Sequence, residues 1–396
     1  MPRDDLIDAL RGFALFGILA VNIQSFVWGV GSPSLGVLYP NSSTADQVTL
    51  FLVALLFEYK FYPIFCFCFG YGFAVQTRRW TAGGIDAGER FTRRMNFMLI
   101  MGALHGLLLW FGDILARYAI AGYILRRYLG QGPRALLNAT KFWLIVAVVT
   151  GVVFACIAGV TSAGDKDAAQ QNESAKLDGA QTFEIYTEAG YIDATIQRAK
   201  DFLTVTITYV FVLPQLMPFF LLGALAAQLK WLRYASRYRS FWQRVFWFGL
   251  LIGLPVNIAF AVSQVAVASN PWMPSSIWEA LLPTFTPVLA LAYVAAFALL
   301  RATVPGLALM RLLAPAGRVA LTLYISQSVL MMLLLNGFGL GLGATFGQLQ
   351  LFVMALMAYG LLLGLAHLMH RFTIPAPLEV LWRQYTNASA LHEKNT

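Results

Sequence analysis

Residues 245–268 read VFWFGLLIGLPVNIAFAVSQVAVA, a stretch without a single charged side chain. About 20 apolar residues in a helix cross the hydrocarbon layer of a bilayer. Apolar stretches of this kind recur from Ala9 to Met369, and 59% of the 396 residues are hydrophobic while 12% are charged. Soluble domains carry about a quarter charged residues, so this composition predicts an integral membrane protein.

The backbone of a membrane span has to satisfy its own hydrogen bonds, and helices do so. The alternating pattern of a β-barrel is absent from the sequence. We therefore expect an all-α, polytopic helix bundle that forms one domain over residues 1–396. The expected spans, about ten in number, cover residues 9–29, 49–77, 96–111, 114–125, 135–161, 202–227, 245–268, 277–300, 319–335 and 352–369.

Basic residues gather in alternate loops between these spans. Five arginines lie between residues 78 and 94, three between 126 and 134, and five lysines or arginines between 230 and 244. This alternation is the positive-inside pattern, which also explains the net charge of +9 without a nucleic-acid partner. It predicts cytoplasmic termini, a cytoplasmic tail at 372–396 and a polar loop on the outer side at 162–201, with room for a short helix.

Cysteine and histidine spacing gives little support for a metal site. Cys66, Cys68 and Cys156 form no C-x-x-C pair, so we expect neither a disulfide nor a metal from them. His367 and His370 lie three residues apart, which is compatible with a metal pair, but no further ligand is evident. A solvated helix end is the favoured interpretation, and we expect no metal.

Ionisable and amide side chains are costly in hydrocarbon, so the few within the spans mark a functional interior. They are Asn22, Glu58, Lys60, His105, Asp113, Arg117, Gln215, Tyr324 and Gln327.

Two of these polar residues are expected to meet at one depth. Asn22 lies 11 residues after Arg11, and His105 lies 11 residues after Arg94. If both arginines mark the cytoplasmic end of a helix, both polar groups lie about 16 Å from that end. If the helix continues beyond the end of the third span, Asp113 follows about two turns after His105, on a similar face.

This pair suggests proton-transfer chemistry. His105 can take a proton from an amine or hydroxyl and return it, and the Asn22 amide can stabilise a developing oxyanion. The alternative is that both side chains only make hydrogen bonds between helices. Asp113 could orient His105, or form an ion pair with Arg117 four residues later.

Other polar groups are candidates for a substrate path. Tyr324, Gln327 and Ser328 share one face of a helix, and Gln215 lies between two prolines where we expect the helix to break. Glu58 and Lys60 are two residues apart and do not face each other, so they indicate a helix break or an interfacial segment.

The arginines could also hold an anionic ligand. The positive-inside rule accounts for most of them. Arg11, Arg94 and Arg318 start helices beside the polar faces, and their charge suits the phosphates of coenzyme A.

Five motifs, spread over nearly the whole chain, resemble the YeiB-like family of bacterial membrane proteins. They are LIDALRGFALFGILAVNIQSF at 6–26, FCFGYGFAVQ at 67–76, RRMNFMLIMGALHGLLLWFGDILARYAIAGYIL at 93–125, GRVALTLYISQS at 317–328 and PLEVLWRQYTN at 377–387. Ala376 stands where the family usually has a glycine.

That family is in turn similar to the transmembrane acyltransferase superfamily, which includes the acyltransferase-3 proteins and lysosomal heparan-α-glucosaminide N-acetyltransferase. The resemblance implies transfer of an acyl group from cytosolic acyl-CoA to an acceptor across the membrane. Arg11 matches the basic residue of the superfamily's first helix, and Asn22 its catalytic asparagine or histidine. The lysosomal enzyme's catalytic histidine has no match here, so His105 is assigned from the depth argument alone.

The leading hypothesis is an acyltransferase of the bacterial inner membrane. Arg11, Arg94 and Arg318 would hold acyl-CoA, with acetyl-CoA as the expected donor. Asn22 and His105 would carry the chemistry, with Asp113 orienting His105, and Gln215, Tyr324 and Gln327 would line the substrate path. The acceptor would be an envelope sugar or another small molecule that arrives from the outer side. A homodimer is left open.

The alternative hypothesis is a small-molecule transporter that uses the same polar residues as its substrate site. Inverted repeats would support a transporter, and no internal symmetry is evident in the sequence. A catalytically inactive scaffold or receptor is a third alternative.

Overall fold

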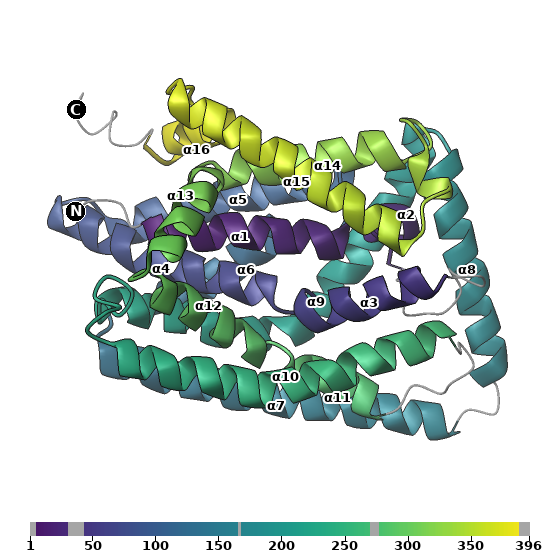
Figure 1. Cartoon of the computed structure of the whole chain (residues 1–396), viewed down its shortest axis with the longest axis horizontal. Helices are drawn as coiled ribbons and strands as arrows, with labels where there is room; N and C mark the ends of the chain where they lie inside the picture. Colours follow the sequence, from purple (N-terminus) through teal and green to yellow (C-terminus); the bar gives the residue numbers. More distant parts are fainter. Residues whose placement is uncertain (1–4, 31–42, 165–167, 270–276, 388–396) are drawn as a thin grey trace.

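Every regular element in the described part of the chain is a helix (Figure 1). The computed structural model describes residues 5–30, 43–164, 168–269 and 277–387. Helices are the expected solution for a chain with this much apolar sequence, since each one satisfies its own backbone hydrogen bonds. The prediction of an all-α fold is confirmed.

Six helical stretches of the described residues are long and apolar enough to cross a membrane. They are Thr44–Ala82, Pro133–Ile157, Phe211–Gln228, Arg239–Ala266, Leu281–Leu300 and Gln348–Arg371. The helices α13 (Val304–Arg318) and α14 (Ala320–Leu335) bend by 78° and together give a seventh candidate. The membrane helix bundle is confirmed at this level, and the count of about ten spans with cytoplasmic termini stays a prediction.

The other expected spans correspond to shorter or more polar helices. They are α1 (Asp5–Asn22) with the short α2 (Ser25–Trp28), α5 (Ala87–Leu108) and α6 (Leu115–Leu125). The start of α1 carries Asp5, Asp8 and Arg11, yet most of this helix is buried inside the protein. Asp8 is buried in protein and Arg11 is half-buried, whereas Asp5 is exposed at the start of the helix, so the low apolarity of α1 is compatible with a place in the bundle.

Two long helices present apolar side chains on the surface. On α7 (Pro133–Gly164) Ile145 is 64% exposed, and on α10 (Arg239–Ser269) Leu251 is 68% exposed. Contiguous apolar surface of this kind is costly in water and favourable in lipid. The faces of α7 and α10 are therefore suited to contact the hydrocarbon layer.

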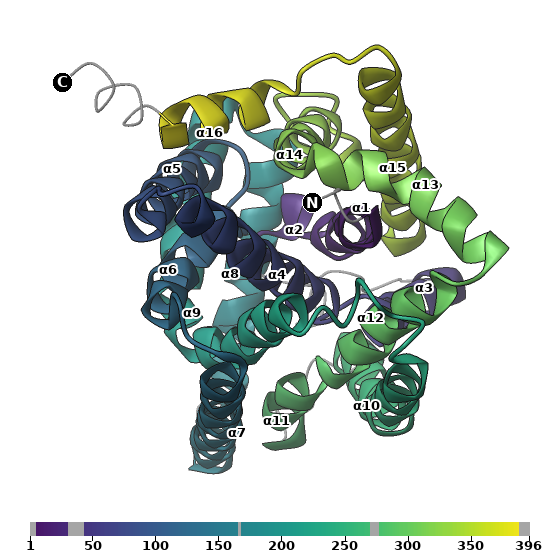
Figure 2. The same ribbon diagram turned by 90° about the vertical axis from the view of Figure 1, so that its left-hand side faces the viewer.

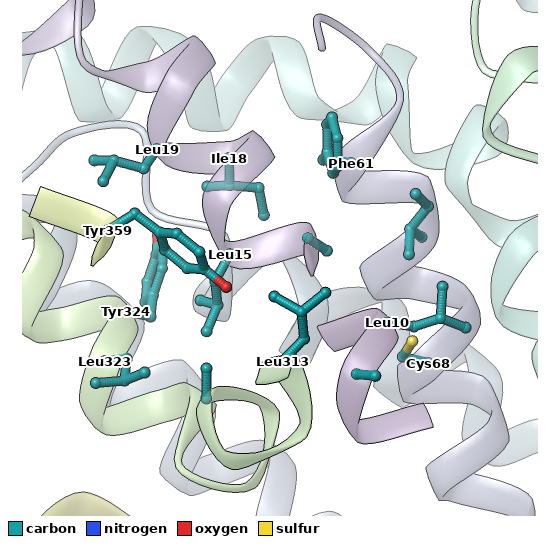
Figure 3. Packing of buried hydrophobic residues seen from close by; sticks show 14 of the residues in the cluster. Leu10, Leu15, Ile18, Leu19, Phe61, Cys68, Leu313, Leu323, Tyr324 and Tyr359 are labelled. Carbon is teal, nitrogen blue, oxygen red and sulfur yellow. The ribbon is translucent and has the colours of Figure 1, made fainter. Parts of the chain in front are cut away.

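Helix α1 occupies the centre of the bundle, as the end-on view shows (Figure 2). Its neighbours include α4 (Phe61–Ala82), α13, α14 and α15 (Gln348–Arg371). Figure 3 shows the core that they build from Leu10, Leu15, Ile18 and Leu19 of α1 together with Phe61, Cys68, Leu313, Leu323, Tyr324 and Tyr359. The apolar side of the first span is thus enclosed by other helices.

Two glycines let α1 and α13 approach closely. A Cβ atom on Gly12 would lie 2.2 Å from the Leu313 carbonyl oxygen, and one on Gly317 would lie 1.7 Å from the Asp8 carbonyl oxygen. No larger residue fits either position without moving a backbone. This contact keeps Arg318, at the end of α13, beside the start of α1, where Arg318 Nη2 donates to Asp5 Oδ1 at 2.7 Å.

The predicted break near Glu58 and Lys60 is confirmed. Helix α3 (Thr44–Leu56) ends before it and α4 begins after it, and Tyr59 has a positive φ of 61°. The Lys60 side chain is fully buried and donates to the Ala54 carbonyl at 2.5 Å.

The predicted break at the prolines of the sixth span is wrong. Helix α9 (Tyr191–Gln228) continues through Pro214 and Pro218. Proline lacks the N–H donor of a helical hydrogen bond, but packing of α9 against α4 and α7 holds the helical path.

The segment 162–201 is largely helical instead of a polar loop. Helix α8 (Ala168–Glu188) fills most of it and lies across one end of the bundle, and α9 begins at Tyr191 (Figure 1). The Tyr186 hydroxyl donates to Asp201 Oδ2 at 2.8 Å, and the Tyr186 carbonyl accepts from the Gly337 N–H at 3.0 Å. These tertiary contacts fix α8 against α9 and the turn after α14.

The expected tail begins with a helix that folds back on the bundle. Helix α16 (Pro377–Asn387) packs on α5 and α14, at the same end of the molecule as the start of α1 (Figure 1). Glu379 accepts hydrogen bonds from the backbone N–H groups of Leu321 and Thr322 and from the Thr322 hydroxyl. This carboxylate therefore caps the first turn of α14.

The candidate span Leu281–Leu300 consists of the end of α11 (Ile277–Phe285) and of α12 (Val288–Leu300). The short helices η2 (Arg126–Tyr128) and η3 (Leu342–Ala344) are connectors.

Candidate functional site

A chain of three hydrogen-bonded side chains lies in the interior of the bundle. His105 Nδ1 is 2.9 Å from Asp113 Oδ1, and His105 Nε2 is 2.8 Å from Ser328 Oγ. His105, Asp113 and Ser328 are 2%, 0% and 3% exposed. With Asp113 ionised and His105 neutral, Nδ1 carries the ring hydrogen and Nε2 accepts from the Ser328 hydroxyl.

A glycine makes the contact between His105 and Asp113 sterically possible. Gly102 lies one turn before His105 on α5, and a Cβ atom there would be 2.2 Å from the Ala116 nitrogen and 2.5 Å from Asp113 Oδ2. The Asp113 carboxylate also accepts from the Ala116 N–H at 2.7 Å, at the start of α6. Close packing of α5 and α6 thus fixes both the histidine and its carboxylate partner.

Aromatic rings enclose the histidine. The Tyr324 ring centroid lies 4.9 Å from that of His105, and the Trp110 centroid lies 6.2 Å from it. The Tyr324 hydroxyl accepts from the Ile114 N–H at 3.1 Å, which holds α14 against the turn before α6. The three-residue chain is therefore shielded from water by rings on two sides.

A cavity of about 790 Å³ opens beside this chain. Its lining within the described residues includes the eight arginines Arg11, Arg79, Arg90, Arg94, Arg233, Arg301, Arg318 and Arg383. The acidic side chains in the same lining are Asp8 and Glu379. The cavity extends inward to Ile18, Ile114 and Tyr324, so its inner wall is a neighbour of His105.

All three arginines predicted to bind an anion line this cavity. Arg11 donates to Asp8 Oδ1 at 3.1 Å and Arg318 donates to Asp5, so both charges are partly balanced. Arg94 bonds to Gln76 and lies over the Trp382 ring at 4.1 Å, and it makes no ion pair with a carboxylate of the described residues. Arg94 therefore presents the least compensated positive charge of the three.

The predicted partner of His105 on α1 does not contact it. Asn22 is half-buried at the end of α1, and its amide forms no hydrogen bond with His105 or Asp113 in the described structure. The connection is indirect, because Ser25 Oγ donates to the Asn22 carbonyl at 2.6 Å and accepts from Trp110 Nε1 at 3.0 Å. Asn22 therefore lies near Trp110, one of the two aromatic rings that flank His105.

The expected ion pair of Asp113 with Arg117 is absent from the described residues, and that prediction is wrong. Both carboxylate oxygens of Asp113 are occupied by His105 and the Ala116 N–H. The Arg117 guanidinium lies 5.8 Å from the Tyr209 ring centroid, and its Nε and Nη2 atoms are buried without a hydrogen-bond partner among the described residues.

The three expected substrate-lining residues lie in different surroundings. Tyr324 lines the cavity, whereas Gln215 and Gln327 are not part of its described lining. The Gln327 amide is 4% exposed and donates to the Leu15 carbonyl at 3.4 Å, so it joins α14 to α1.

The amino-acid sequence of the chain is similar to a described family and to several known proteins. Residues 226–389 match the family described as protein of unknown function (DUF418). The chain is 25% identical over 401 residues to the uncharacterised protein YxaH of Bacillus subtilis (strain 168), covering 98% of this chain and 95% of YxaH. It is 27% identical over 413 residues to the uncharacterised protein YeiB of Escherichia coli (strain K12), covering 98% of each. Similarity to both proteins along nearly the whole chain supports membership of the YeiB-like family.

A third relative matches only part of this YeiB-like chain. It is an uncharacterised 39.9 kDa protein from the amylase 3′ region of Bacillus acidopullulyticus, 35% identical over 123 residues, or 31% of this chain and 33% of that protein. No solved structure matches significantly. The descriptions of these relatives name no activity, so the link to acyltransferases stays a prediction.

The histidines near the end of α15 have protein partners in this YeiB-like structure. His367 Nε2 is 2.8 Å from the Leu312 carbonyl oxygen, and His370 Nε2 is 3.0 Å from Arg318 Nη1. Within the described ranges, no group of three or more histidine, cysteine or acidic side chains is placed to hold a metal ion.

Sequence reasoning missed the role of Ser328 in the YeiB-like site. It placed Ser328 on one face of a helix with Tyr324, but Ser328 lies 223 residues from His105. The available signal was a small hydroxyl side chain one turn after a tyrosine in an otherwise apolar helix. Only the tertiary contact between Ser328 on α14 and His105 on α5 identifies its partner.

Proposed function

We propose that this YeiB-like protein is an acyltransferase of the bacterial inner membrane. It moves an acyl group, acetyl being the expected one, from cytosolic acyl-CoA to an amine or hydroxyl acceptor reached from the outer side. The observation that carries the proposal is the hydrogen-bonded chain of Asp113, His105 and Ser328 beside an arginine-lined cavity.

The cavity is the proposed binding site for acyl-CoA. Its volume of about 790 Å³ lies in the range of cofactor sites. The donor carries several phosphate charges, and arginine makes charge-assisted, bidentate bonds to phosphate. Arg11, Arg94 and Arg318 serve as phosphate ligands, with Arg94 contributing most because it makes no ion pair within the described residues.

The inner end of the cavity suits the thioester arm of the donor. Ile18, Ile114 and Tyr324 belong to the inner lining of the cavity, and the Tyr324 ring lies 4.9 Å from that of His105, which is not itself part of the described lining. A neutral thioester is much less costly to bury there than a phosphate. The lining therefore favours one orientation of the donor, with its phosphates among the arginines and its reactive carbonyl at the inner end of the cavity.

His105 is the proposed general base. Its Nε2 atom faces a hydroxyl at 2.8 Å, a distance suited to proton transfer, and Asp113 fixes the ring through Nδ1. The imidazolium that forms after proton transfer is stabilised by the Asp113 carboxylate. Asn22, half-buried near Trp110, is the proposed amide donor to the oxyanion.

The proposed orientation assigns one ligand to each side of the membrane. Cytoplasmic termini put the arginine-lined cavity on the cytosolic side, where acyl-CoA is available. The acceptor then approaches from the side of Trp110 and α8, and we propose an envelope sugar or another small molecule for it.

Binding of acetyl-CoA to the purified, detergent-solubilised protein tests the donor site. Calorimetry should find saturable binding that weakens as salt is raised, because phosphate contacts are screened. Arg94→Gln should weaken binding at least tenfold, which corresponds to about 1.4 kcal/mol.

The matched control for this experiment is Arg237→Gln. Arg237 is exposed and is not part of the described cavity lining, so its loss should leave the affinity unchanged. Absence of saturable acetyl-CoA binding to the folded wild-type protein would contradict the proposed donor. Uptake of acetyl-CoA into proteoliposomes without thiol release would support the transporter alternative instead.

A further inference from the structure

The hydroxyl of Ser328 has an unusual partner for a serine in an apolar helix. Such a serine ordinarily donates to the carbonyl one turn earlier. Here that carbonyl, on Tyr324, is 3.4 Å from Ser328 Oγ, whereas His105 Nε2 is 2.8 Å away. Ser328 Oγ is therefore closer to the histidine than to the carbonyl, at a distance that allows the hydroxyl to donate to Nε2.

The order of groups is that of an activated nucleophile. A carboxylate contacts one ring nitrogen of a histidine, and the other ring nitrogen contacts a serine hydroxyl. In this order the histidine can take the serine proton while the carboxylate stabilises the resulting charge. The pattern is recognised by geometry, whatever the fold or chain order.

We propose that Ser328 is the catalytic nucleophile and carries the acyl group as an ester between donor and acceptor. This inference deepens the acyltransferase proposal and depends on it for the identity of the donor. It turns one transfer into two steps, with free coenzyme A leaving before the acceptor reacts.

In the first step, His105 Nε2 takes the proton of the Ser328 hydroxyl, and Oγ attacks the thioester carbonyl carbon. A C–O bond forms and the carbonyl oxygen becomes an oxyanion. The oxyanion collapses, the C–S bond breaks, and the proton on Nε2 passes to the departing sulfur. The products are an acyl ester on Ser328 and the free thiol.

In the second step, the acceptor amine or hydroxyl gives its proton to His105 Nε2 and attacks the ester carbonyl. The bond from the carbonyl carbon to Ser328 Oγ breaks, and the proton on Nε2 returns to Oγ. The acylated acceptor leaves, and the serine and histidine regain their starting states.

A covalent intermediate suits the position of Ser328. It lies one turn beyond Tyr324 on the same face of α14, and Tyr324 forms part of the inner cavity wall. The acyl group therefore has to pass Tyr324, whereas the charged part of the donor stays among the arginines. Burial of Asp113, His105 and Ser328 limits hydrolysis of the ester by water.

Acid-quenched reactions of the full-length protein test the nucleophile with two acyl donors. Acetyl-CoA tests the proposed donor, and p-nitrophenyl acetate tests the serine independently of coenzyme A. After either donor, peptide mass spectrometry should locate one acetyl group on Ser328, and thiol or nitrophenol should appear in a burst of about one equivalent per chain.

The variant Ser328→Ala should lose the label and slow thiol release at least about a hundredfold. Ser326→Ala is the matched control, because Ser326 lies two residues away on the same helix and is only half-buried. Ser328→Cys should keep a nucleophile and collect the acetyl group as a thioester, which separates lost chemistry from lost folding.

Two results distinguish failure of this inference from failure of the acyltransferase proposal. Thiol release by Ser328→Ala at the wild-type rate would overturn the nucleophile and leave the donor assignment intact. Labelling of Ser328 by p-nitrophenyl acetate alone, with no thiol release from acetyl-CoA, would support the nucleophile and overturn the donor. A wild-type protein that neither donor labels would overturn the covalent step.

Discussion

His105 interacts with partners from two regions of the chain, and only one of these could be found in the sequence. Asp113 is only eight residues away, so its closeness in the sequence made it a candidate partner, although the contact itself forms across the turn between α5 and α6. Ser328 is 223 residues away and belongs to another helix. A local pattern contains no information on which helices become neighbours, so the sequence predicted half of the hydrogen-bonded chain.

Asn22 shows the limit of the depth argument at the same scale. Equal spacing from an arginine predicts equal depth, but it does not give the direction in which a side chain points. Asn22 is linked to the surroundings of the histidine through Ser25 Oγ, which donates to the Asn22 carbonyl and accepts from Trp110 Nε1 at 3.0 Å. The rotation of α1 depends on how α4, α13 and α15 pack around it.

At the residue scale, the orientation of His105 should depend on the Asp113 carboxylate. In Asp113→Asn the amide can donate to Nδ1, which puts the ring hydrogen on Nε2 and removes the base. We expect thiol release from acetyl-CoA to fall about a thousandfold, with acetyl-CoA affinity unchanged.

The control for this prediction is Asp193→Asn, because Asp193 is exposed at the start of α9. It should release thiol at the wild-type rate. If Asp113→Asn also stays within twofold of the wild type, Asp113 has no part in orienting the base.

At the scale of elements, the contact of α5 with α6 builds the site, and Gly102 permits that contact. A methyl group in Gly102→Ala would meet the Ala116 nitrogen at 2.2 Å, so the helices have to move apart. We expect a loss of about 1–3 kcal/mol of stability and a lower midpoint of thermal unfolding. Thiol release should fall further than the loss of stability explains, since Asp113 moves from His105.

Gly360→Ala is the matched control for the helix contact. Gly360 lies inside α15 with no neighbouring atom within 4 Å of an added Cβ atom. Alanine favours a helix interior, so this variant should be as stable as the wild type or slightly more stable. A Gly102→Ala protein that matches the wild type in both measurements would show that the close contact is unimportant.

The elements themselves were largely predictable, and their exceptions share a cause. Long apolar stretches predicted α7, α10 and α15 because helix formation in lipid depends on local sequence. Helix α16 and the bend of 78° between α13 and α14 were not predicted. Both depend on tertiary contacts, such as the capping of α14 by Glu379.

At the scale of the whole molecule, the arginine-lined cavity and α8 lie at different ends of the bundle. The position of the cavity and α8 at opposite ends underlies the proposal that donor and acceptor enter from opposite sides of the membrane. Single cysteines can test it after Cys156, which is exposed, is replaced by serine; Cys66 and Cys68 are buried. An impermeant maleimide added to intact spheroplasts should label Asp178→Cys on α8.

The reporter for the opposite side is Ser236→Cys, in the basic turn between α9 and α10. It should react only after the membrane is permeabilised, because the positive-inside pattern assigns that turn to the cytoplasm. If Ser236→Cys is labelled in intact spheroplasts and Asp178→Cys is not, the protein has the opposite orientation. That result would contradict the proposed entry of acyl-CoA from the cytoplasm.

Single-turnover release of thiol from acetyl-CoA tests most directly whether this membrane protein is an acyltransferase built around His105. The comparison is between the purified wild-type protein and His105→Gln, with acetyl-CoA binding measured for both. We predict equal binding, about one thiol per wild-type chain, and release at least a thousandfold slower in the variant. No thiol release by the wild type, or equal release by both proteins, would contradict the account.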